Sequence, residues 1–310
     1  MVKKLKIYTN FKISKLHKKS ILLIGNFDGL HLGHQKLFNL AKQYKKKNNI
    51  KFGVVTFDPI PKMFFNKNLK NYRISNLNQK IKYFKNYNVD FIVVKKFNKK
   101  FSKINCLNFI SQILYKKLNP KYIFVSNNFK FGNKREGDVK LLKSLEKKYQ
   151  YRIIKPKPLK KKNKIISSTI IRKLLSNGNL DKANKYLGRN WSIEGFVTKG
   201  RMMGKKIGFP TCNIELQEYV IEKPGVYAVK VYLKNRKNFL KGIANLGYRP
   251  TFNQKKILLE VNIFNFSGNL YNKKLREDFV KFIRKEKKFK GIDQLRKQIK
   301  LDLKIAKQIK

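Results

Sequence analysis

The chain of 310 residues has few cysteines, few histidines and few acidic residues, and each shortage narrows what it can be. Cys106 and Cys212 are too few for a disulfide framework or a cysteine-rich zinc site, so a reducing compartment is expected. No apolar run approaches the roughly 20 residues of a membrane span, and the basic N-terminus lacks the apolar core of a signal peptide. These absences predict a soluble, cytoplasmic protein with no membrane partner.

The scarcity of acidic residues leaves a large positive charge. There are 17 Asp and Glu residues against 75 Lys and Arg residues, which gives a formal net charge of +58. Such a charge can indicate nucleic-acid binding or a lysine-rich composition. The lysines are spread along the whole chain and accompany abundant Asn, Ile, Phe and Tyr, which favours a compositional bias. We therefore predict no specific nucleic-acid partner, although the charge should attract phosphorylated small molecules.

The first half of the chain alternates apolar runs with amphipathic helical patterns. The runs that predict strands occupy 20–24, 52–57, 90–94, 121–125 and 151–154. Between them, apolar residues with helical spacing fall within 37–44, 77–84, 104–118 and 139–145. This alternation predicts a Rossmann-like α/β domain, in which helices cover both faces of a parallel sheet. Ligands bind such sheets at the carboxyl ends of the strands.

After about Gly188 the chain changes to short strand-like segments separated by glycine and proline. These segments occupy 192–198, 226–233, 240–245 and 257–264. Regular short strands with such turns predict a small antiparallel β-barrel or sandwich. An apolar stripe from Ile292 to Ala306 predicts helix at the C-terminal end. We therefore expect an α/β domain at 1–187 and a mainly β domain with C-terminal helices at 188–310.

Two of the three histidines lie in the segment 25–34, which reads GNFDGLHLGH and follows the first predicted strand. A strand that runs through a glycine-rich turn into a helix presents N–H groups and a positive dipole end to phosphate. His31 and His34 share one face at that helix end. Zinc would need further ligands, which no His or Cys cluster supplies. An incidental pair would leave the surrounding glycines unexplained, so the motif favours nucleotidyl transfer, with imidazoles donating to phosphate oxygens.

Two more polar loops follow predicted strands. Thr56-Phe57-Asp58-Pro59 follows the second strand and the segment 126–132 follows the fourth. In a parallel sheet these loops and the histidine turn would converge on one crevice.

Ser168, Thr169 and Arg172 open a short predicted helix. Hydroxyl groups at a helix start often only cap the helix, and an arginine can be a solvated surface residue. Hydroxyls and a cation at that position also suit a triphosphate. The residues alone leave both interpretations open.

A third motif, GRMMGKKIGFPTCN, occupies 200–213. It is not a Walker A loop, because its glycines are one residue too close and no Ser or Thr follows the lysine. It could be an ordinary loop. However, Thr211 and Asn213 would face the same side of a strand, and their oxygens suit Mg²⁺ and phosphate. Glu260, on a later strand, is a candidate general base inside a barrel and an inert solvated residue outside it.

Together these motifs resemble the family of prokaryotic bifunctional riboflavin kinase/FMN adenylyltransferases, also called FAD synthetases. The similarity covers nearly the whole chain, and the order and spacing of the blocks across two modules are highly specific. The matching blocks are GNFDGLHLGHQ (25–35), TFDPIP (56–61), NNFKFG (127–132), ISSTIIR (166–172), YLGR (186–189), KGRMMGKKIGFPTCNI (199–214), ANLGYRPTF (244–252) and LLEVNIFNFSGNLY (258–271).

For the N-terminal module, the resemblance implies a nucleotidyltransferase that joins AMP from ATP to FMN and releases pyrophosphate. It implies catalytic roles for His31, His34 and Arg172. It implies flavin contacts for Asp58 and Asn128. The residues that it implies for ATP binding are Gly25, Phe27, Asp28, Gly33, Ser168 and Thr169.

For the C-terminal module, the resemblance implies a riboflavin kinase barrel that phosphorylates the ribityl 5′-hydroxyl group of riboflavin. Glu260 would accept the hydroxyl proton. The residues implied for ATP binding are Gly204, Thr211 and Asn213, and Thr211 would also ligate Mg²⁺. The implied ligands are therefore Mg²⁺, ATP as co-substrate, riboflavin, FMN and FAD.

Two other functions stay open. HLGH is similar to the ATP-binding signature of class I aminoacyl-tRNA synthetases, and the charge suits RNA. The nearest match to their KMSKS-type loop, Lys12-Ile13-Ser14-Lys15, lies upstream of the histidines, which is the wrong order. The other alternative is a non-catalytic flavin or nucleotide binder, and the intact polar residues at all three motifs argue against it.

Overall fold

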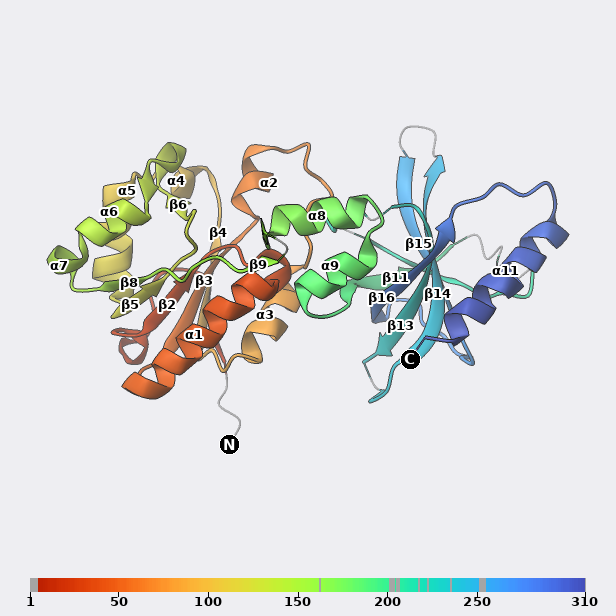
Figure 1. Ribbon diagram of the computed structural model, residues 1–310, viewed down its shortest axis with the longest axis horizontal. Helices are drawn as coiled ribbons and strands as arrows, with labels where there is room; N and C mark the ends of the chain where they lie inside the picture. Colours follow the sequence, from red (N-terminus) through yellow and green to blue (C-terminus); the bar gives the residue numbers. More distant parts are fainter. Residues whose placement is uncertain are drawn as a thin grey trace. The chain divides into compact units, whose positions relative to one another are not determined.

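The computed structural model of the chain describes residues 5–161, 163–200, 204, 207–216, 218–221, 223–234, 236–250 and 255–309. Their contacts divide the chain into two compact units (Figure 1). Unit 1 holds the described residues up to Lys70 together with Leu77–Ser167. Unit 2 holds Asn71–Asn76 and the described residues from Ser168 onward. These units are defined by contacts within the fold. The predicted boundary between residues 187 and 188 separates the two functional modules instead, and it stays a prediction.

Unit 1 is built on a six-stranded sheet with the order β1-β4-β3-β2-β5-β8, in which every pairing is parallel. Its strands are β1 (Lys6–Tyr8), β2 (Ile21–Ile24), β3 (Phe52–Asp58), β4 (Phe91–Lys96), β5 (Tyr122–Phe124) and β8 (Arg152–Ile154). The chain moves outward from β2 through β3 and β4, and then returns to place β5 on the other side of β2. The order therefore reverses at β2, and such switch points bind ligands at the carboxyl edge of the sheet.

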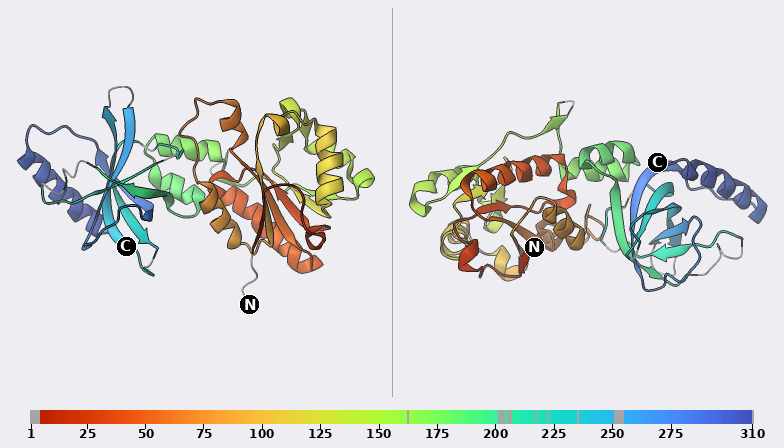
Figure 2. Two further views of the ribbon diagram at one scale, coloured as in Figure 1. Left: turned by 180° about the vertical axis from the view of Figure 1, so that it is seen from behind. Right: turned by 90° about the horizontal axis from the view of Figure 1, so that it is seen from below.

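Helices cover both faces of this sheet (Figure 2). On one face, Phe38 of α1 (Leu32–Asn48) stacks on Phe84 of α3 (Leu77–Lys85), with ring centroids 5.3 Å apart. The other face is covered by η3 (Phe109–Leu118), which is wound as a π-helix, and by α6 (Val139–Ser144). The predicted parallel α/β fold is confirmed.

Shorter elements complete unit 1. They are η1 (Lys15–His17), η2 (Asp28–Leu30), α2 (Pro61–Phe65), α4 (Lys99–Ser102), α5 (Cys106–Asn108), η4 (Asn133–Arg135), α7 (Glu146–Tyr149) and two strand pairs, β6 (Lys130–Phe131) with β7 (Gly137–Asp138) and β9 (Lys160–Lys161) with β10 (Lys164–Ile165).

Unit 2 contains a closed antiparallel barrel with the strand order β11-β12-β15-β14-β13-β16. Its strands are β11 (Trp191–Thr198), β12 (Cys212–Ile214), β13 (Gly225–Leu233), β14 (Leu240–Pro250), β15 (Lys255–Ile263) and β16 (Lys274–Lys285). Alternate residues face inward, and Tyr227, Leu259 and Phe279 are fully buried there. The predicted barrel is confirmed.

Helices flank the barrel in the sequence. α8 (Ser168–Ser176) and α9 (Leu180–Leu187) precede it, and α11 (Ile292–Lys307) follows it. Asn184 of α9 connects to the barrel twice, because its Nδ2 donates to Phe279 O at 3.0 Å and its Oδ1 accepts from Trp191 N at 2.7 Å. C-terminal helices were predicted, and in the described residues after β16 the structure has one, α11, with Ala306 buried against the barrel.

The barrel interior contains a carboxyl group. Glu277 on β16 pairs with Ile193 and Val231, and its side chain is fully buried. Among the described residues, neither carboxyl oxygen of Glu277 has a hydrogen-bond partner. Burial, and then the charge of Asp278, raises the pKa of Glu277 well above its ordinary value of 4.5. Burial, helped by Glu277, also raises the pKa of the Cys212 thiol to about 12.

We expect Glu277→Gln to stabilise the protein, and to do so more strongly as the pH rises. Above pH 4.5 the unfolded chain releases the Glu277 proton while the folded chain keeps it. The stability of the wild type therefore falls from that pH toward the raised folded pKa. Glutamine does not titrate, so the gain should reach roughly 1–3 kcal/mol near pH 8 and nearly vanish near pH 4.

Thermal unfolding midpoints at both pH values measure this effect. The exposed Glu215 provides the matched control, because Glu215→Gln should change neither midpoint. A Glu277→Gln gain that is equal at the two pH values would show that the buried proton is not its cause.

Candidate functional site

The turn between β2 and α1 has an unusual backbone. Phe27, Gly29 and Leu30 all have positive φ, at 48°, 74° and 34°. This conformation is unfavourable for Phe27 and Leu30, because both carry a Cβ. Both side chains are buried in the core below the turn, where the Phe27 ring meets that of Phe38 edge-on at 5.1 Å. Packing of these apolar side chains therefore fixes the shape of the turn.

The two histidines stack on each other at the start of α1. His31 is buried and caps the helix, because its Nδ1 accepts a hydrogen bond from His34 N at 3.4 Å. The imidazole centroids are 3.7 Å apart, and the ring planes are inclined by 22°. A Cβ at Gly33 would stand 3.1 Å from the His31 ring, so this position favours glycine. The sequence prediction that both histidines share one helix face is confirmed.

The two other predicted loops leave the strands on either side of β2. Asp58 ends β3, precedes a cis peptide bond to Pro59, and accepts a hydrogen bond at its carbonyl oxygen from Phe97 N at 3.0 Å. Asn128 follows β5 and is exposed, and its Oδ1 accepts from Ser126 Oγ at 3.0 Å. Because β3 and β5 flank β2 in parallel, all three loops open onto the same edge of the sheet.

A buried lysine supports the turn and was not among the predicted site residues. Lys80 of α3 has no exposed surface, and its Nζ donates to Asn26 O at 3.2 Å and to Thr56 Oγ1 at 3.3 Å. Thr56 Oγ1 itself donates to Asn26 O at 3.2 Å. One sequence feature could have indicated this buried lysine: Lys80 lies four residues before Phe84, on the apolar face of its helix. Lys80 therefore ties the histidine turn to β3 and α3.

The Ser168–Arg172 motif begins α8, which belongs to unit 2. Ser168 and Thr169 lie in the first turn of this helix. Arg172 Nε donates to the carbonyl oxygen of Tyr72 at 2.7 Å, and its guanidinium carbon lies 3.7 Å from the centroid of the Tyr72 ring. That these residues bind ATP together with the histidines stays a proposal.

Asn213 and Glu260 are cross-strand neighbours on the barrel. The amide of Asn213 is oriented by its surroundings, so that its nitrogen donates to Glu260 Oε1 and its oxygen accepts from Gly200 N, both at 3.3 Å. The adjacent residues Ile214 and Leu259 fill the barrel interior, so Asn213 and Glu260 lie on its outer face. Glu260 is half-buried there, in a hydrogen-bonded pair rather than in a fully solvated position.

Glycines let the loop before β12 approach these residues. A Cβ at Gly200 would overlap the Asn213 amide, and a Cβ at Gly204 would stand 3.0 Å from Thr211 Oγ1. Thr211 is exposed and immediately precedes β12. The expectation that Thr211 and Asn213 share a strand face assumed that both residues lie on the strand, so it stays a prediction. Residues 201–203 and 205–206 of this motif lie outside the described residues.

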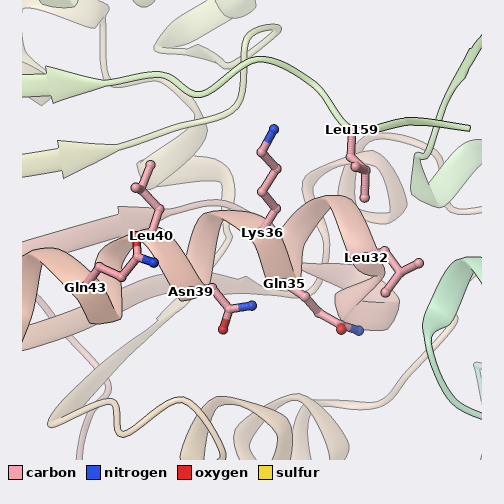
Figure 3. Close-up of a pocket in the computed structure, with 7 residues that line it drawn as sticks. All are labelled: Leu32, Gln35, Lys36, Asn39, Leu40, Gln43 and Leu159. Carbon is pink, nitrogen blue, oxygen red and sulfur yellow. The ribbon is translucent and has the colours of Figure 1, made fainter.

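A surface groove runs along α1. Six side chains of α1 and Leu159 line this groove (Figure 3). Neither histidine is among these lining residues, although Leu32 and Gln35 follow them directly in the chain. Within the described ranges, no group of three or more His, Cys, Asp or Glu side chains could hold a metal ion.

The fold and the two sites define a class of protein. A parallel α/β module carries a histidine turn at its switch point, and an antiparallel barrel carries an amide–carboxylate pair beside a glycine-containing loop. This combination is typical of a two-module transferase that uses nucleotides.

Comparison with known proteins identifies the family. The FAD synthetase family model matches residues 13–170, and the riboflavin kinase family model matches residues 187–310. The chain is 42% identical to the bifunctional riboflavin kinase/FMN adenylyltransferase of Buchnera aphidicola subsp. Schizaphis graminum, over 96% of each chain. It is 36% identical to the protein of that description from Escherichia coli K12, over 91% of this chain and 90% of the relative.

A solved structure supports the fold over the same length. A crystal structure described as that of a macrolide-efflux protein from Streptococcus pneumoniae superposes with a TM-score of 0.85, at 27% identity and over 99% of both chains.

The chain therefore belongs to the family of bifunctional riboflavin kinase/FMN adenylyltransferases. It is an enzyme with two ATP-dependent activities, and the predicted resemblance is confirmed. The C-terminal module produces FMN from riboflavin, and the N-terminal module produces FAD from FMN. This result decides against the tRNA synthetase and non-catalytic alternatives.

Proposed function

We propose that His31 and His34 bind the phosphates of ATP during adenylyl transfer. A phosphate oxygen of FMN attacks the α-phosphorus, the bond to the β-phosphate breaks, and pyrophosphate leaves. Negative charge grows on the phosphate oxygens as this happens. Imidazole N–H groups and the positive end of α1 stabilise that charge. The supporting observation is the stacked pair of rings, 3.7 Å apart, where α1 begins at the switch point of the sheet.

Other residues of the motifs complete this proposal. Gly25, Phe27, Asp28 and Gly33 shape the phosphate turn, and Ser168, Thr169 and Arg172 contribute to the binding of ATP. Asp58 and Asn128, which leave the strands beside β2, contact the flavin. The module that carries this chemistry is assigned to residues 1–187, and the kinase module to residues 188–310.

We assign riboflavin phosphorylation to the outer face of the barrel around Asn213 and Glu260. The 5′-hydroxyl oxygen of riboflavin attacks the γ-phosphorus of ATP, the bond to the β-phosphate breaks, and ADP leaves. Glu260 accepts the hydroxyl proton. The hydrogen bond from the Asn213 amide at 3.3 Å holds this carboxylate in place. Gly204 and Thr211 bind ATP beside it.

The donor set of the barrel site fits a magnesium ion. Thr211 and Glu260 offer hydroxyl and carboxylate oxygens, which are the hard ligands that Mg²⁺ prefers. We propose that Thr211 is its protein ligand. When bound, the ion neutralises charge on the phosphates of ATP.

Removal of divalent ions should therefore stop the kinase reaction. With a chelator in excess over Mg²⁺, FMN formation should fall by roughly 100-fold, because the phosphate charge is no longer neutralised. Added Mg²⁺ should restore the rate, and the thermal unfolding midpoint should stay unchanged throughout. A rate within two-fold of the untreated enzyme would contradict the proposed metal requirement.

Isotopic labelling tests which phosphate each module transfers. With riboflavin as the substrate and ATP labelled at the α-phosphorus, FAD should carry the label and FMN should not. With ATP labelled at the γ-phosphorus, it should enter both flavins, because the new FMN is the substrate for FAD. α-Label in FMN, or FAD formation without pyrophosphate, would refute the proposed reactions.

The cellular location is also a prediction. In the part of the chain that the structure describes, no helix combines the length and apolar character needed to cross a membrane. We propose that the enzyme works in the cytoplasm without a specific nucleic-acid or membrane partner.

A further inference from the structure

We propose that Tyr72 is a positioning residue for Arg172 in adenylyl transfer, an inference that rests on the role proposed above for Arg172. Both residues belong to unit 2, although 100 positions separate them in the chain. The Tyr72 ring lies against the guanidinium group, with 3.7 Å between the ring centroid and the guanidinium carbon. The Tyr72 carbonyl oxygen accepts a hydrogen bond from Arg172 Nε at 2.7 Å.

The two contacts restrict different motions of the arginine. The aromatic face fixes the plane of the guanidinium group, and the hydrogen bond to Nε fixes its rotation within that plane. An arginine binds phosphate through a planar fork of N–H donors, so the direction of that fork decides how well it matches the phosphate oxygens. Pre-setting this direction removes an ordering cost from the transition state. Tyr72 thus acts through Arg172.

Tyr72 is itself held from the barrel side. Its backbone N–H and that of Arg73 both donate to the carbonyl oxygen of Glu218 at 2.9 Å. Val220 N donates to Arg73 O at 2.8 Å, which gives Arg73 a parallel bridge to Tyr219. The short segment Asn71–Asn76 therefore runs like an added strand beside residues 218–220.

Side chains strengthen the same attachment. The buried Arg73 forms an ion pair with Glu218. Trp191, the first residue of β11, donates from its Nε1 to Ile74 O at 2.9 Å, and Asn76 Nδ2 donates to the Tyr219 hydroxyl at 2.7 Å. None of these bonds uses the Tyr72 side chain. Substitutions at Tyr72 should therefore leave the segment in place, and this makes the inference testable.

The test compares three variants. Tyr72→Phe keeps the aromatic face, Tyr72→Leu keeps apolar bulk without it, and Tyr72→Ala removes both. For the conversion of FMN to FAD, we expect the kcat of Tyr72→Phe to stay within two-fold of the wild-type value. The kcat of Tyr72→Leu and of Tyr72→Ala should fall roughly 10-fold, with little change in KM for FMN. Riboflavin phosphorylation should stay within two-fold, which shows that unit 2 is folded. If Tyr72→Ala loses both reactions, the kcat of Tyr72→Phe compared with that of Tyr72→Leu decides whether Tyr72 positions Arg172.

A matched control exists on the barrel. The Arg276 guanidinium carbon also lies 3.7 Å from a tyrosine ring centroid, that of Tyr232. Tyr232→Leu removes a contact with the same centroid distance that does not involve Arg172, so FMN-to-FAD kcat should stay at the wild-type value. If Tyr232→Leu lowers that kcat as much as Tyr72→Leu does, the effect is general destabilisation and the inference is wrong.

Variants of Arg172 separate this inference from the function on which it rests. In an Arg172→Lys background, which lacks the planar fork, Tyr72→Leu should change kcat by less than two-fold. If Arg172→Ala leaves FAD formation intact, the role proposed for Arg172 is wrong and the positioning role with it. If Arg172→Ala abolishes FAD formation but Tyr72→Leu behaves like Tyr72→Phe, only the positioning role is overturned.

Discussion

Replacement of His34 by alanine should lower the conversion of FMN to FAD by roughly 10²–10⁴-fold, while riboflavin phosphorylation continues at the wild-type rate. The reason is the loss of a donor to the phosphate oxygens where α1 begins. The imidazole of His34 stacks on that of His31 at 3.7 Å, so the same substitution also removes the support of the second ring. Rates of FMN and FAD formation, measured separately with riboflavin and with FMN, give both numbers.

His31 needs a different substitution, because its Nδ1 caps α1. Alanine would remove the cap as well as the donor and would cost about 1 kcal/mol of stability. His31→Asn keeps a side-chain acceptor for the helix and removes the imidazole. We expect FAD formation to fall by a similar factor with little change in the unfolding midpoint.

The third histidine serves as the control. His17 lies in the same unit, stacks on Phe91 at 4.4 Å, and its Nδ1 is hydrogen-bonded to the Tyr8 hydroxyl at 2.9 Å. It lies outside the histidine turn, so His17→Ala should leave FAD formation within two-fold. If His34→Ala keeps more than a tenth of the wild-type rate, or if His17→Ala is as damaging, the histidine turn is not the adenylyl-transfer site.

The second large effect is expected at Glu260. Glu260→Gln should lower riboflavin phosphorylation by roughly 10²–10³-fold and leave the conversion of FMN to FAD unchanged. Glutamine has nearly the same shape and still offers an oxygen to the Asn213 amide, but it cannot take up the proton of the ribityl hydroxyl group. The substitution should lower kcat and leave substrate binding nearly unchanged, because the proton is transferred in the transition state.

Glu215→Gln is the matched control for Glu260. Glu215 immediately follows β12 and is exposed, so its neutralisation should leave both reactions within two-fold. If Glu260→Gln retains at least half of the kinase rate, Glu260 is not the general base of the reaction. If it stops FAD formation from added FMN as well, the two activities do not occupy separate sites.

Most of the fold was predictable because local pattern and tertiary structure agree. The strands β2 to β5 are apolar runs between amphipathic helices, and periodicity alone finds them. In the parallel sheet and the barrel, β1, β12 and β16 were not predicted, for physical reasons. β1 and β12 have three residues each, too few to show alternation, and β16 reads KLREDFVKFIRK, in which charged residues mask the apolar pattern of the inward positions. Glu277 shows this best, because a glutamate occupies an inward position where the pattern calls for an apolar residue.

The candidate sites divide in the same way. The histidine turn, Asn213 and Glu260 were singled out because they lie in short motifs or on a predicted strand, whereas the pairing of Asn213 with Glu260 was not predicted. The inner or outer placement of Glu260 needed the barrel register. Lys80 and Tyr72 were missed, because each acts through a residue far away in the sequence, Asn26 and Arg172 respectively. No local pattern indicates a contact between positions 72 and 172.

The central claim is that two separate sites act in sequence on one flavin, and mixing two variants tests it most directly. With riboflavin, ATP and Mg²⁺, His34→Ala alone should accumulate FMN, and Glu260→Gln alone should leave riboflavin unchanged. An equimolar mixture should form FAD, because FMN made by the first variant is the substrate of the second. Chromatographic separation of the three flavins over time measures this. FAD from the mixture supports the account, whereas a mixture that stops at FMN or riboflavin, or a single variant that loses both activities while folded, would contradict it.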